Sequence, residues 1–442
     1  MSGRKVIKNA SWIIGCKIVQ SVIGLIIGMI SARYLGPSNY GLIGYASSVA
    51  TFLLPVMQLG LSKTLVQEFI KRPDREGEVL GTAIVFNLVS AIACMGGIFG
   101  FLSIANAGET VTITVGVLFS FSLLFQATEN VQYWFQAKLL SKYPSIASVI
   151  AYTIVALYKV FLLITGKSVL WFSVSSTLDY LLISFILLVI YHRKGSQKLR
   201  FSWRLGIEML HSSKYYIVSS MMVSVFQQTD RIMLKLMMNE AETGYYNAAI
   251  TCVGVTSFVF AAIVDSMRPP ILEAKHEESS SYEPRITQLY SVITYFSLAQ
   301  CVIMVFLAKP LVLVMYGEDY LPSVTALRIA VWYVTFSNYG SIRNIWMLAE
   351  SKQKYLWIIN LSGALANVAL NAVLIPFLGA VGAAIASLFT QFFSNFIIGF
   401  IIRPIRYNNT LMLRGFNPKP LFRYLSDLFS QVMKRIKKKG GK

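Results

Sequence analysis

Residues 227–249 read QQTDRIMLKLMMNEAETGYYNAA, and the fold class of the chain follows from them. The segment begins inside one long apolar run and ends at the start of another, yet it holds the adjacent pair Asp230–Arg231. An ionisable side chain in a bilayer-length segment costs roughly 2.5–3.5 kcal/mol on insertion scales, so it usually faces a cavity or a partner. The segment therefore predicts a membrane-embedded protein with a polar interior.

A second stretch echoes the first. Residues 33–46 read RYLGPSNYGLIGYA, and Gly41 and Ala46 align with Gly244 and Ala249. The echo divides the chain near its middle into two halves of similar hydropathy. Because transporters built from two repeated bundles have internal symmetry of this kind, we expect two related halves.

The composition is that of an integral membrane protein. Hydrophobic residues make up 55% of the chain and charged residues 14%, with a mean hydropathy of +0.59. A soluble protein has roughly 25% charged residues. The net charge of +20 would suit nucleic acid, but the basic residues lie between apolar spans and at the end of the chain. We therefore expect no nucleic-acid partner.

Cysteines and histidines predict neither a disulfide set nor a metal site. The cysteines all fall inside apolar runs, without the spacing of ligands, and are Cys16, Cys94, Cys252 and Cys301. The histidines lie singly in polar connections, at His192, His211 and His276. The N-terminus has a basic start and an apolar stretch longer than about 20 residues without an A-x-A site, which predicts a retained first span.

The hydropathy pattern predicts an all-α polytopic membrane protein with about twelve helices of about 20 residues each. We place these spans at residues 9–32, 40–62, 79–104, 111–137, 144–165, 168–191, 213–237, 244–267, 286–308, 323–349, 355–375 and 379–402. They form an N-terminal six-helix bundle over residues 1–200 and a C-terminal six-helix bundle over 201–403. Strands are not expected, because lipid leaves open strand backbone unpaired.

Lysine and arginine predict the orientation. Most of them fall in connections on the N-terminal side of the membrane, and the opposite side holds only Arg33, Lys167, Lys235 and Lys309. Both termini are therefore expected in the cytoplasm, with the protein in the cell membrane. The outer connections are too short to hold a soluble catalytic domain. The basic link at residues 192–214 is expected to join the two bundles as a linker.

Residues 404–442 are predicted to form a basic cytoplasmic tail. Five apolar residues fall on one helical stripe beside a run of lysines, at Leu421, Leu425, Leu428, Val432 and Ile436. Two interpretations stay open: an in-plane helix on anionic lipid, or a solvated positive tail.

Eight charged residues lie well inside the predicted spans. They are Lys17, Glu129, Lys159, Asp179, Asp230, Arg231, Arg328 and Arg343. Several belong to polar stripes at helical spacing on the first, fourth, seventh and tenth spans. A polar stripe on an apolar span must face something other than lipid, so these stripes predict a shared hydrated cavity. The alternative is pairwise structural bridging, for example between Lys159 and Asp179.

The predicted cavity holds more cations than anions, which favours an anionic substrate group such as phosphate. Glu129, Asp179 and Asp230 are candidates either for a coupling ion, H⁺ or Na⁺, or for charge balance. No other cofactor is expected. The sequence lacks G-x-x-x-x-G-K-[ST], G-x-S-x-G and H-E-x-x-H motifs, so we expect a transporter without enzymatic activity and without an ATP site.

The sequence resembles the polysaccharide flippases, the O-antigen and capsule repeat-unit transporters of the MOP (MATE-like) superfamily. The resemblance rests on four motifs: Arg33-Tyr34-Leu35-Gly36-Pro37 with Tyr40-Gly41, then Asp230-Arg231-Ile232-Met233-Leu234, Gly244-Tyr245-Tyr246-Asn247-Ala248-Ala249, and Leu378-Gly379-Ala380-Val381-Gly382-Ala383-Ala384. It implies two six-helix bundles around a central cavity. It also implies alternating access that carries a polyprenyl-diphosphate-linked oligosaccharide from the cytoplasmic to the outer leaflet.

The resemblance places Lys17, Arg33, Asp230 and Arg231 on or beside helices that flank the cavity. Our hypothesis is that Lys17, Arg33, Arg231 and Arg343 engage the diphosphate. The partners implied are the lipid-linked oligosaccharide, membrane lipids, and the polymerase and glycosyltransferases of polysaccharide synthesis.

Three other functional hypotheses compete with the polysaccharide flippase. A MATE-like drug/ion antiporter would want acidic residues deep in the first helix, where Lys17 stands instead. A membrane-embedded glycosyltransferase or polymerase would need acidic groups or a long loop outside the membrane. A lipid II-type flippase usually has two extra helices.

Overall fold

The structure is a computed structural model. It describes residues 3–195 and 197–422, and for residues 3–11 and 14 it describes the backbone only. Every regular element within these residues is a helix, as predicted. A helix satisfies its backbone hydrogen bonds within one segment, which apolar surroundings require.

The chain divides into two compact units, Met1–Gly244 and Tyr245–Lys442. In the first unit the helices are α1 Gly3–Met57, η1 Leu61–Lys63, α2 Leu65–Lys71, η2 Pro73–Arg75, α3 Glu76–Ala105, α4 Thr110–Ser120, α5 Ser122–Thr128, α6 Val131–Ala137, α7 Lys142–Ile164, α8 Val169–Lys194 and α9 Trp203–Met237. Helix α10, Glu240–Gly254, crosses the boundary.

The second unit continues with further helices. They are α11 Ser257–His276, α12 Tyr282–Met315, η3 Glu318–Tyr320, α13 Ser323–Ala330, α14 Tyr333–Ala349, η4 Gln353–Tyr355, α15 Leu356–Phe392, η5 Phe393–Ile397, α16 Ile398–Ile401, η6 Arg403–Ile405 and α17 Arg406–Arg414. The predicted boundary between bundles at residues 200 and 201 stays a prediction, because it concerns which helices move together during transport.

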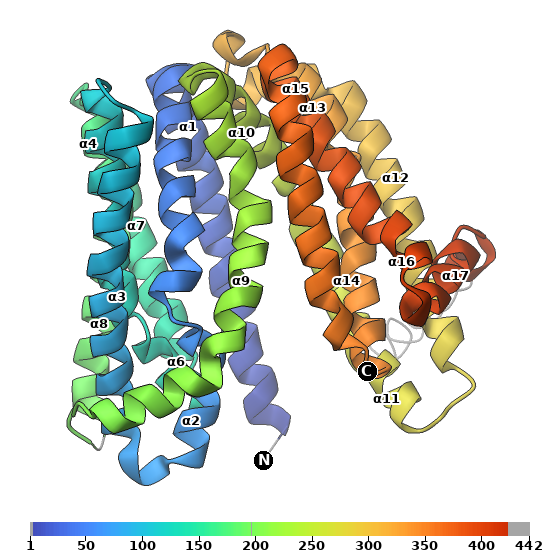
Figure 1. Ribbon diagram of the computed structural model, residues 1–442, viewed down its shortest axis with the longest axis horizontal. Coiled ribbons are helices and arrows are strands. Elements are labelled where there is room, and N and C mark those ends of the chain that lie inside the picture. Colours follow the sequence, from blue (N-terminus) through green and yellow to red (C-terminus); the bar gives the residue numbers. More distant parts are fainter. Residues whose placement is uncertain (1–2, 196, 423–442) are drawn as a thin grey trace, which may run out of the picture. The chain divides into compact units, whose positions relative to one another are not determined.

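Helix α1 is two helices joined at a break. Gly36 has φ 70° and ψ 171°, a conformation that side chains disfavour, and Pro37 follows it. The chain reverses there, as the blue ribbon in Figure 1 shows. The sequence predicted a seven-residue connection here, but a single glycine is enough to turn the chain. Helix α1 then packs on α7 and α9.

The fourth predicted span is interrupted. Helices α4, α5 and α6 follow one another with breaks at Phe121 and at Glu129–Asn130. Hydroxyl groups on helix α8 satisfy carbonyls near these breaks. Thr177 Oγ1 donates to the Leu118 carbonyl at 3.1 Å, and Ser184 Oγ donates to the Phe125 carbonyl at 2.6 Å. Neighbouring hydroxyls commonly satisfy backbone groups freed by a break in an apolar environment.

The link that follows α8 is bound to α3 along much of its length, although the sequence predicted an ordinary linker. The Arg200 amide donates to the Gly77 carbonyl at 3.1 Å, and the Gly77 amide donates to Gln197 Oε1 at 3.0 Å. A Cβ at Gly77 would lie 2.2 Å from the Lys198 carbonyl oxygen, and one at Gly81 would lie 2.3 Å from that of Arg200. These glycines therefore let the link lie directly on the α3 backbone.

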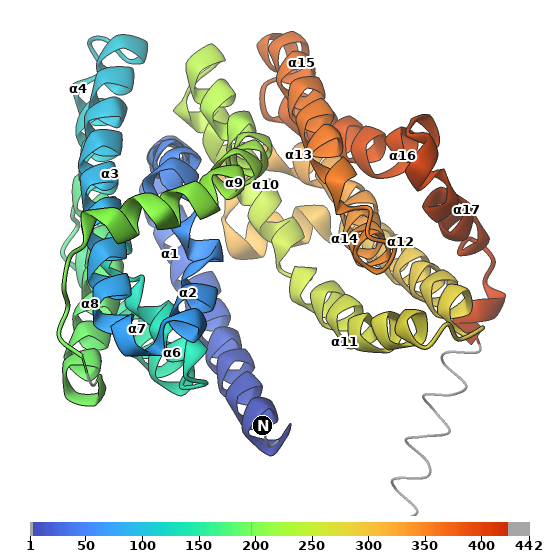
Figure 2. The same ribbon diagram turned by 60° about the horizontal axis from the view of Figure 1, so that its bottom comes forward.

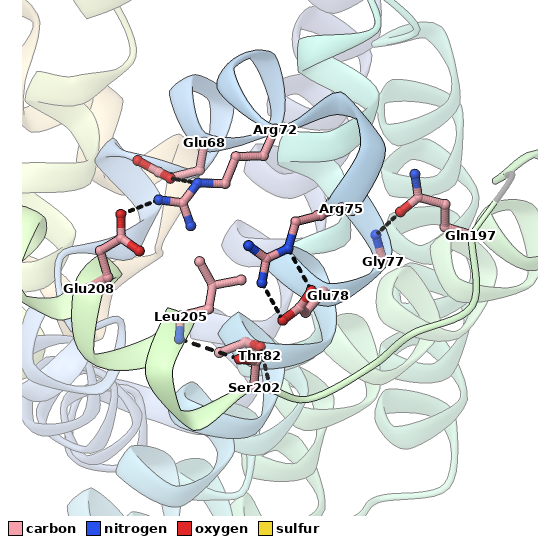
Figure 3. A network of polar contacts seen from close by, with 10 residues as sticks. All are labelled: Glu68, Arg72, Arg75, Gly77, Glu78, Thr82, Gln197, Ser202, Leu205 and Glu208. Carbon is pink, nitrogen blue, oxygen red and sulfur yellow. Dashed lines mark hydrogen bonds and ion pairs between the residues drawn. The ribbon is translucent and has the colours of Figure 1, made fainter.

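Ion pairs and a helix cap complete this attachment, which Figure 3 shows from close by. Arg72 lies between Glu68 and Glu208 and joins α2 to α9. Ser202 caps α9 by accepting from the Leu205 amide at 3.4 Å, and its own amide donates to Thr82 Oγ1 at 3.0 Å. Helix α9 then runs obliquely before it turns upward alongside α1 (Figure 1).

The second unit contains another broken helix. Within α15, Gly379 has φ 52° and ψ −130°, at the predicted link between the last two spans. Helix α15 packs on α13, and α12 packs on α14 and α17; α12 and α17 lie near one another at one end of this unit in Figure 2. A buried hydrogen bond from Tyr290 Oη to Asn408 Oδ1, 3.0 Å long, joins α12 to α17.

Within residues 3–195 and 197–422, seven segments are long and apolar enough to cross a membrane, and an eighth qualifies if the pair α10–α11, bent by 44°, is one span. They are Gly15–Met57, Pro73–Ala105, Thr110–Ala137, Lys142–Ile164, Val169–Lys194, Tyr282–Met315 and Gln353–Ile401. This confirms a multi-span helical membrane protein. Of the predicted tail stripe, Leu425, Leu428, Val432 and Ile436 lie outside the described residues.

Candidate transport site

The two echoing stretches of sequence meet in the structure. A Cβ at Gly41 would lie 1.8 Å from the carbonyl oxygen of Glu240, and a Cβ at Gly244 would lie 2.1 Å from that of Pro37. Since real Cβ atoms essentially never approach within 3.0 Å of another heavy atom, only glycine fits at either position. We call residues 37–41 with 240–244 the glycine junction. It brings the start of α10 directly onto the α1 backbone.

A buried lysine lies beside the glycine junction. Lys235 has a side chain that is 4% exposed, and its Nζ lies 2.7 Å from Glu109 Oε2 and 2.8 Å from Glu240 Oε1. Thr112 also donates to Glu109 Oε2, at 2.7 Å. The hydrogen bond from Lys235 holds the pKa of Glu109 below its ordinary value. The sequence marked Lys235 only as an outer-side cation, and sequence reasoning missed its burial between two carboxylates.

The charged pair on α9 divides between two environments. Asp230 is 5% exposed, whereas Arg231 is half-buried and its Nη1 donates to Gln228 Oε1 at 3.4 Å. Neighbouring positions on a helix of 3.6 residues per turn point about 100° apart, so the two charges face different surroundings. About two helical turns before them, Ser224 Oγ donates to the Thr51 carbonyl at 3.0 Å and holds α9 against α1.

The two predicted cations of α1 are accessible. Lys17 and Arg33 are both exposed, and no carboxylate lies within 4 Å of Lys17 among the described residues. Between them, Gly24 brings α1 close to α7, since a Cβ there would lie 3.3 Å from the Tyr152 ring. Gly24 lies about two helical turns after Lys17, on the same face of α1, so this face is exposed at Lys17 and contacts α7 at Gly24.

Behind Gly24 lies a polar cavity of about 130 Å³ within the first unit. Helix α7 contributes Lys159 and helix α8 contributes Asp179. Their side chains share the cavity, but no nitrogen–oxygen contact within 4.0 Å joins them in the described part of the chain. Asp179 Oδ1 and the Ser175 hydroxyl are buried without a hydrogen-bond partner there. The direct Lys159–Asp179 bridge that the sequence allowed is therefore not formed.

A second carboxylate lies near this cavity. Glu129 follows the last turn of α5, at the break before α6, and interacts electrostatically with Asp179. Two carboxylates and one ammonium group thus lie inside one helical bundle, with room for a few waters at about 30 Å³ each. Sequence reasoning missed Tyr152, Ser175 and Ser176 in the lining. Their spacing to Lys159 and Asp179, three to seven residues, was the available signal.

Arg343 lies in the second unit and is 4% exposed. Its Nη1 donates to the Ser394 carbonyl at 2.6 Å, its Nε has no partner, and no carboxylate lies within 4 Å among the described residues. Ser394 belongs to η5, a π-helical turn, and such turns occur frequently at functional sites. Arg343 was predicted to line a cavity, and that role stays a prediction.

A family model described as polysaccharide biosynthesis protein matches residues 30–325. The chain belongs to the polysaccharide biosynthesis protein family. This confirms the resemblance drawn from the sequence motifs. An uncharacterized membrane protein of Methanocaldococcus jannaschii is 25% identical over 233 residues, which are 49% of this chain and 45% of that relative, so the match spans less than half of its length.

The fold is that of the MOP-superfamily transporters. The lipid II flippase MurJ in an inward closed conformation has a TM-score of 0.69 and 15% identity, covering 93% of this chain and 92% of that one. An inward-facing multidrug resistance MATE family transporter has a TM-score of 0.68 and 13% identity, covering 89% and 95%. A MOP superfamily transporter from Pyrococcus furiosus has a TM-score of 0.56 and 12% identity, covering 92% and 96%.

Proposed function

We propose that this protein carries a polyprenyl-diphosphate-linked oligosaccharide from the cytoplasmic to the outer leaflet of the cell membrane by alternating access. Membership of the polysaccharide biosynthesis family carries the proposal, because such synthesis needs a membrane step and the chain has a transporter fold. Both termini are cytoplasmic in this proposal. The oligosaccharide would come from glycosyltransferases and pass to a polymerase.

We also propose about twelve spans in two groups of six, since a span needs about 20 residues. The segments Gly15–Met57 and Gln353–Ile401 have 43 and 49 residues, and each contains a glycine at positive φ near its middle. Each is therefore counted as two spans. The bent pair α10–α11 is counted as one span, and helix α9 and the pair α13–α14 complete the number. The polar residues of α9 and of α13–α14 lower their hydropathy, as a cavity-facing role would require.

The diphosphate needs cations that it can reach. Lys17 and Arg33 on α1 are exposed, and Arg231 on α9 is half-buried next to Gln228. All three belong to the first unit, on two helices that pack together. A guanidinium grips phosphate oxygens bidentately, and an ammonium acts as a point charge. We assign these three residues to the diphosphate. We assign Arg343, which is buried, to contact with the diphosphate at a later stage of the transport cycle.

The carboxylates Glu129, Asp179 and Asp230 are proposed to couple transport to H⁺ or Na⁺ or to balance neighbouring charge. The Asp179 oxygen that lacks a protein partner supports an exchangeable proton or ion at the cavity. Lys159 lines the same cavity and repels a metal cation, which favours H⁺ over Na⁺ at that place.

A flipping experiment tests the function. The protein is reconstituted in proteoliposomes with a fluorescent polyprenyl-diphosphate disaccharide, and flipping is measured under imposed proton or sodium gradients. We expect flipping by the wild type and at least a tenfold fall in rate for Lys17→Gln, Arg33→Gln and Arg231→Gln. Lys309→Gln, an exposed cation of the second unit, is the matched control and keeps the wild-type rate.

The outcomes separate the function from the residues. If no polyprenyl-diphosphate oligosaccharide is flipped under any gradient, the proposed function is wrong. If flipping occurs and all three variants match the wild type, the function stands and the assignment of the cations is wrong. Asp179→Asn should remove the dependence on the coupling gradient while leaving downhill flipping measurable.

A further inference from the structure

An apolar groove lies between α1 and α7, separate from the polar cavity. Its wall on α1 is one helical stripe, Trp12, Gly15, Cys16 and Val19, and its wall on α7 includes Ile146 and Ile150. Its volume is about 630 Å³, within the roughly 300–1,000 Å³ of small-molecule sites. We call it the α1–α7 groove. The residues that line it carry no charge.

The groove narrows along the two helices. A Cβ at Gly15 would meet no heavy atom within 4 Å, whereas a Cβ at Gly24 would lie 3.3 Å from the Tyr152 ring. The helices are therefore apart at Gly15 and in contact at Gly24. Trp12 is 37% exposed and Ile150 is 44% exposed, so large apolar surfaces are unpacked where the helices separate.

A cation marks the wide end of the groove. The Nζ of Lys142, in the first turn of α7, lies 5.1 Å over the centroid of the Trp12 ring. No carboxylate lies within 4 Å of Lys142 in the part of the chain that the structure describes. An apolar slot with an unneutralised ammonium group at one end matches an amphiphile with an apolar chain and an anionic head. In the proposed topology this end faces the cytoplasm.

We propose that the α1–α7 groove docks the polyprenyl chain of the lipid-linked substrate, with Lys142 beside its diphosphate. The inference rests on the proposed function. Bulk phospholipid is the competing occupant, and charge decides between them: a diphosphate carries more negative charge than a single phosphodiester, so Lys142 favours it. Because lipid tails are as apolar as the groove, its selectivity comes from packing and from Lys142. We therefore expect the groove to prefer the polyprenyl-diphosphate lipid over bulk phospholipid several-fold.

Photo-crosslinking tests the occupant. The full chain carries a diazirine amino acid in place of Ile150, in vesicles of phosphatidylethanolamine and phosphatidylglycerol with a small fraction of polyprenyl-diphosphate disaccharide. We expect the captured polyprenyl lipid to exceed its share of total lipid at least fivefold. The same label at Ile92, on α3 and 63% exposed, is the control and should capture lipids in proportion to their abundance.

Substitutions test the walls and the cation separately. Lys142→Gln should remove the excess capture at position 150, and Lys142→Arg should keep it. Gly15→Trp should fill the groove and also remove it, whereas Gly97→Trp on α3, where a Cβ likewise meets nothing within 4 Å, should not. The crosslinking with the native groove does not depend on whether the tryptophan variants fold.

The same vesicles report flipping, so the two proposals fail in different ways. Proportional capture at position 150 by a protein that flips the substrate overturns the groove and leaves the function standing. Excess capture by a protein that does not flip supports the groove as a polyprenyl site and overturns the function. Excess capture that persists in Lys142→Gln overturns the role of the lysine.

Discussion

Replacing Gly41 with alanine tests whether the glycine junction holds the start of α10 against α1. The new Cβ would lie 1.8 Å from the Glu240 carbonyl oxygen, and ordinary contact begins at 3.4 Å, so the backbones must separate by about 1.6 Å. Overpacking of this kind costs about 1–3 kcal/mol. If the junction parts during transport, this cost disfavours the joined state and shifts the equilibrium about 5–150-fold toward the parted one.

A buried cysteine measures the shift. Thr243 is fully buried in the junction, and Thr243→Cys would react with an impermeant maleimide only when the junction parts. Cys16→Ser removes the one half-exposed native thiol, and the other native cysteines are buried. We expect Gly41→Ala to raise the labelling rate of Thr243→Cys at least fivefold. Gly97→Ala, where a Cβ meets nothing within 4 Å, should leave that rate unchanged.

Thermal unfolding in detergent distinguishes a shifted equilibrium from damage to the fold. The junction reasoning predicts faster labelling with a single cooperative transition, because the parted state is still folded. An unchanged labelling rate together with an unchanged transition would refute this reasoning. The alanine Cβ at position 41 would then fit without separating α1 from the backbone at Glu240. Broad loss of the transition would show that the contact is needed for folding itself.

Four further predictions concern charges and the chain end. Lys235→Met should lower the unfolding midpoint less than Glu109→Gln does at neutral pH, because the first leaves accessible carboxylates and the second leaves a buried ammonium group with one partner fewer. The pKa of Glu109 is lowered from 4.5, so its contribution is fully present above that pH and is lost below it; the difference in midpoint between wild type and Glu109→Gln should vanish as the pH falls through the lowered pKa. Arg343→Met should lower the flipping rate at least tenfold in the vesicle assay without lowering the midpoint, because the guanidinium is buried without a carboxylate among the described residues. A chain ending at Phe422 should flip at the wild-type rate in that assay, whereas one ending at Arg414 should be less stable.

The reason for the last difference lies in residues 415–417. Tyr295 Oη donates to the Phe416 carbonyl at 2.6 Å, and Ser291 Oγ donates to the Asn417 carbonyl at 2.9 Å. A Cβ at Gly415 would lie 2.5 Å from Tyr290. The sequence assigned residues 404–442 to a basic cytoplasmic tail, and that assignment stays a prediction. The packing of residues 415–417 on α12 could not be predicted, because it depends largely on backbone carbonyls, which any sequence supplies.

The helical class was predictable because apolar runs of bilayer length leave the backbone few alternatives. Gly36 lies in the predicted connection between the first two spans and Gly379 at the predicted link between the last two, and both have positive φ. Whether a charge is buried was less predictable. Lys235 lies two residues from the predicted end of its span, where the sequence suggests water, yet two carboxylates from other elements enclose it. Such partners come from long-range contacts that hydropathy does not contain.

The bound link between α8 and α9 illustrates the same limit. Its basic composition predicted an ordinary linker, but Gly77 and Gly81 on α3 admit its backbone at van der Waals contact. A glycine in a helix interior costs roughly 1 kcal/mol relative to alanine, which signals that something approaches it. A glycine in a helix therefore indicates where a close contact is made, but it does not indicate which segment makes that contact. The attachment of the link to α3 could be seen only in the structure.

The two glycines that the sequence echo matches also contact each other's surroundings in the structure. Gly41 and Gly244 were matched as equivalent positions of two repeats, and in the structure each lies against the backbone that leads to the other. Contacts of this kind are reciprocal, so a side chain at one glycine displaces the backbone that the other needs. Gly41→Ala and Gly244→Ala should therefore be non-additive, the double variant costing less than the sum of the two, because the first separation already makes room for the second methyl group. Additive costs in a double-mutant cycle on the unfolding midpoint would mean that the two contacts are independent and that the symmetry has no mechanical role.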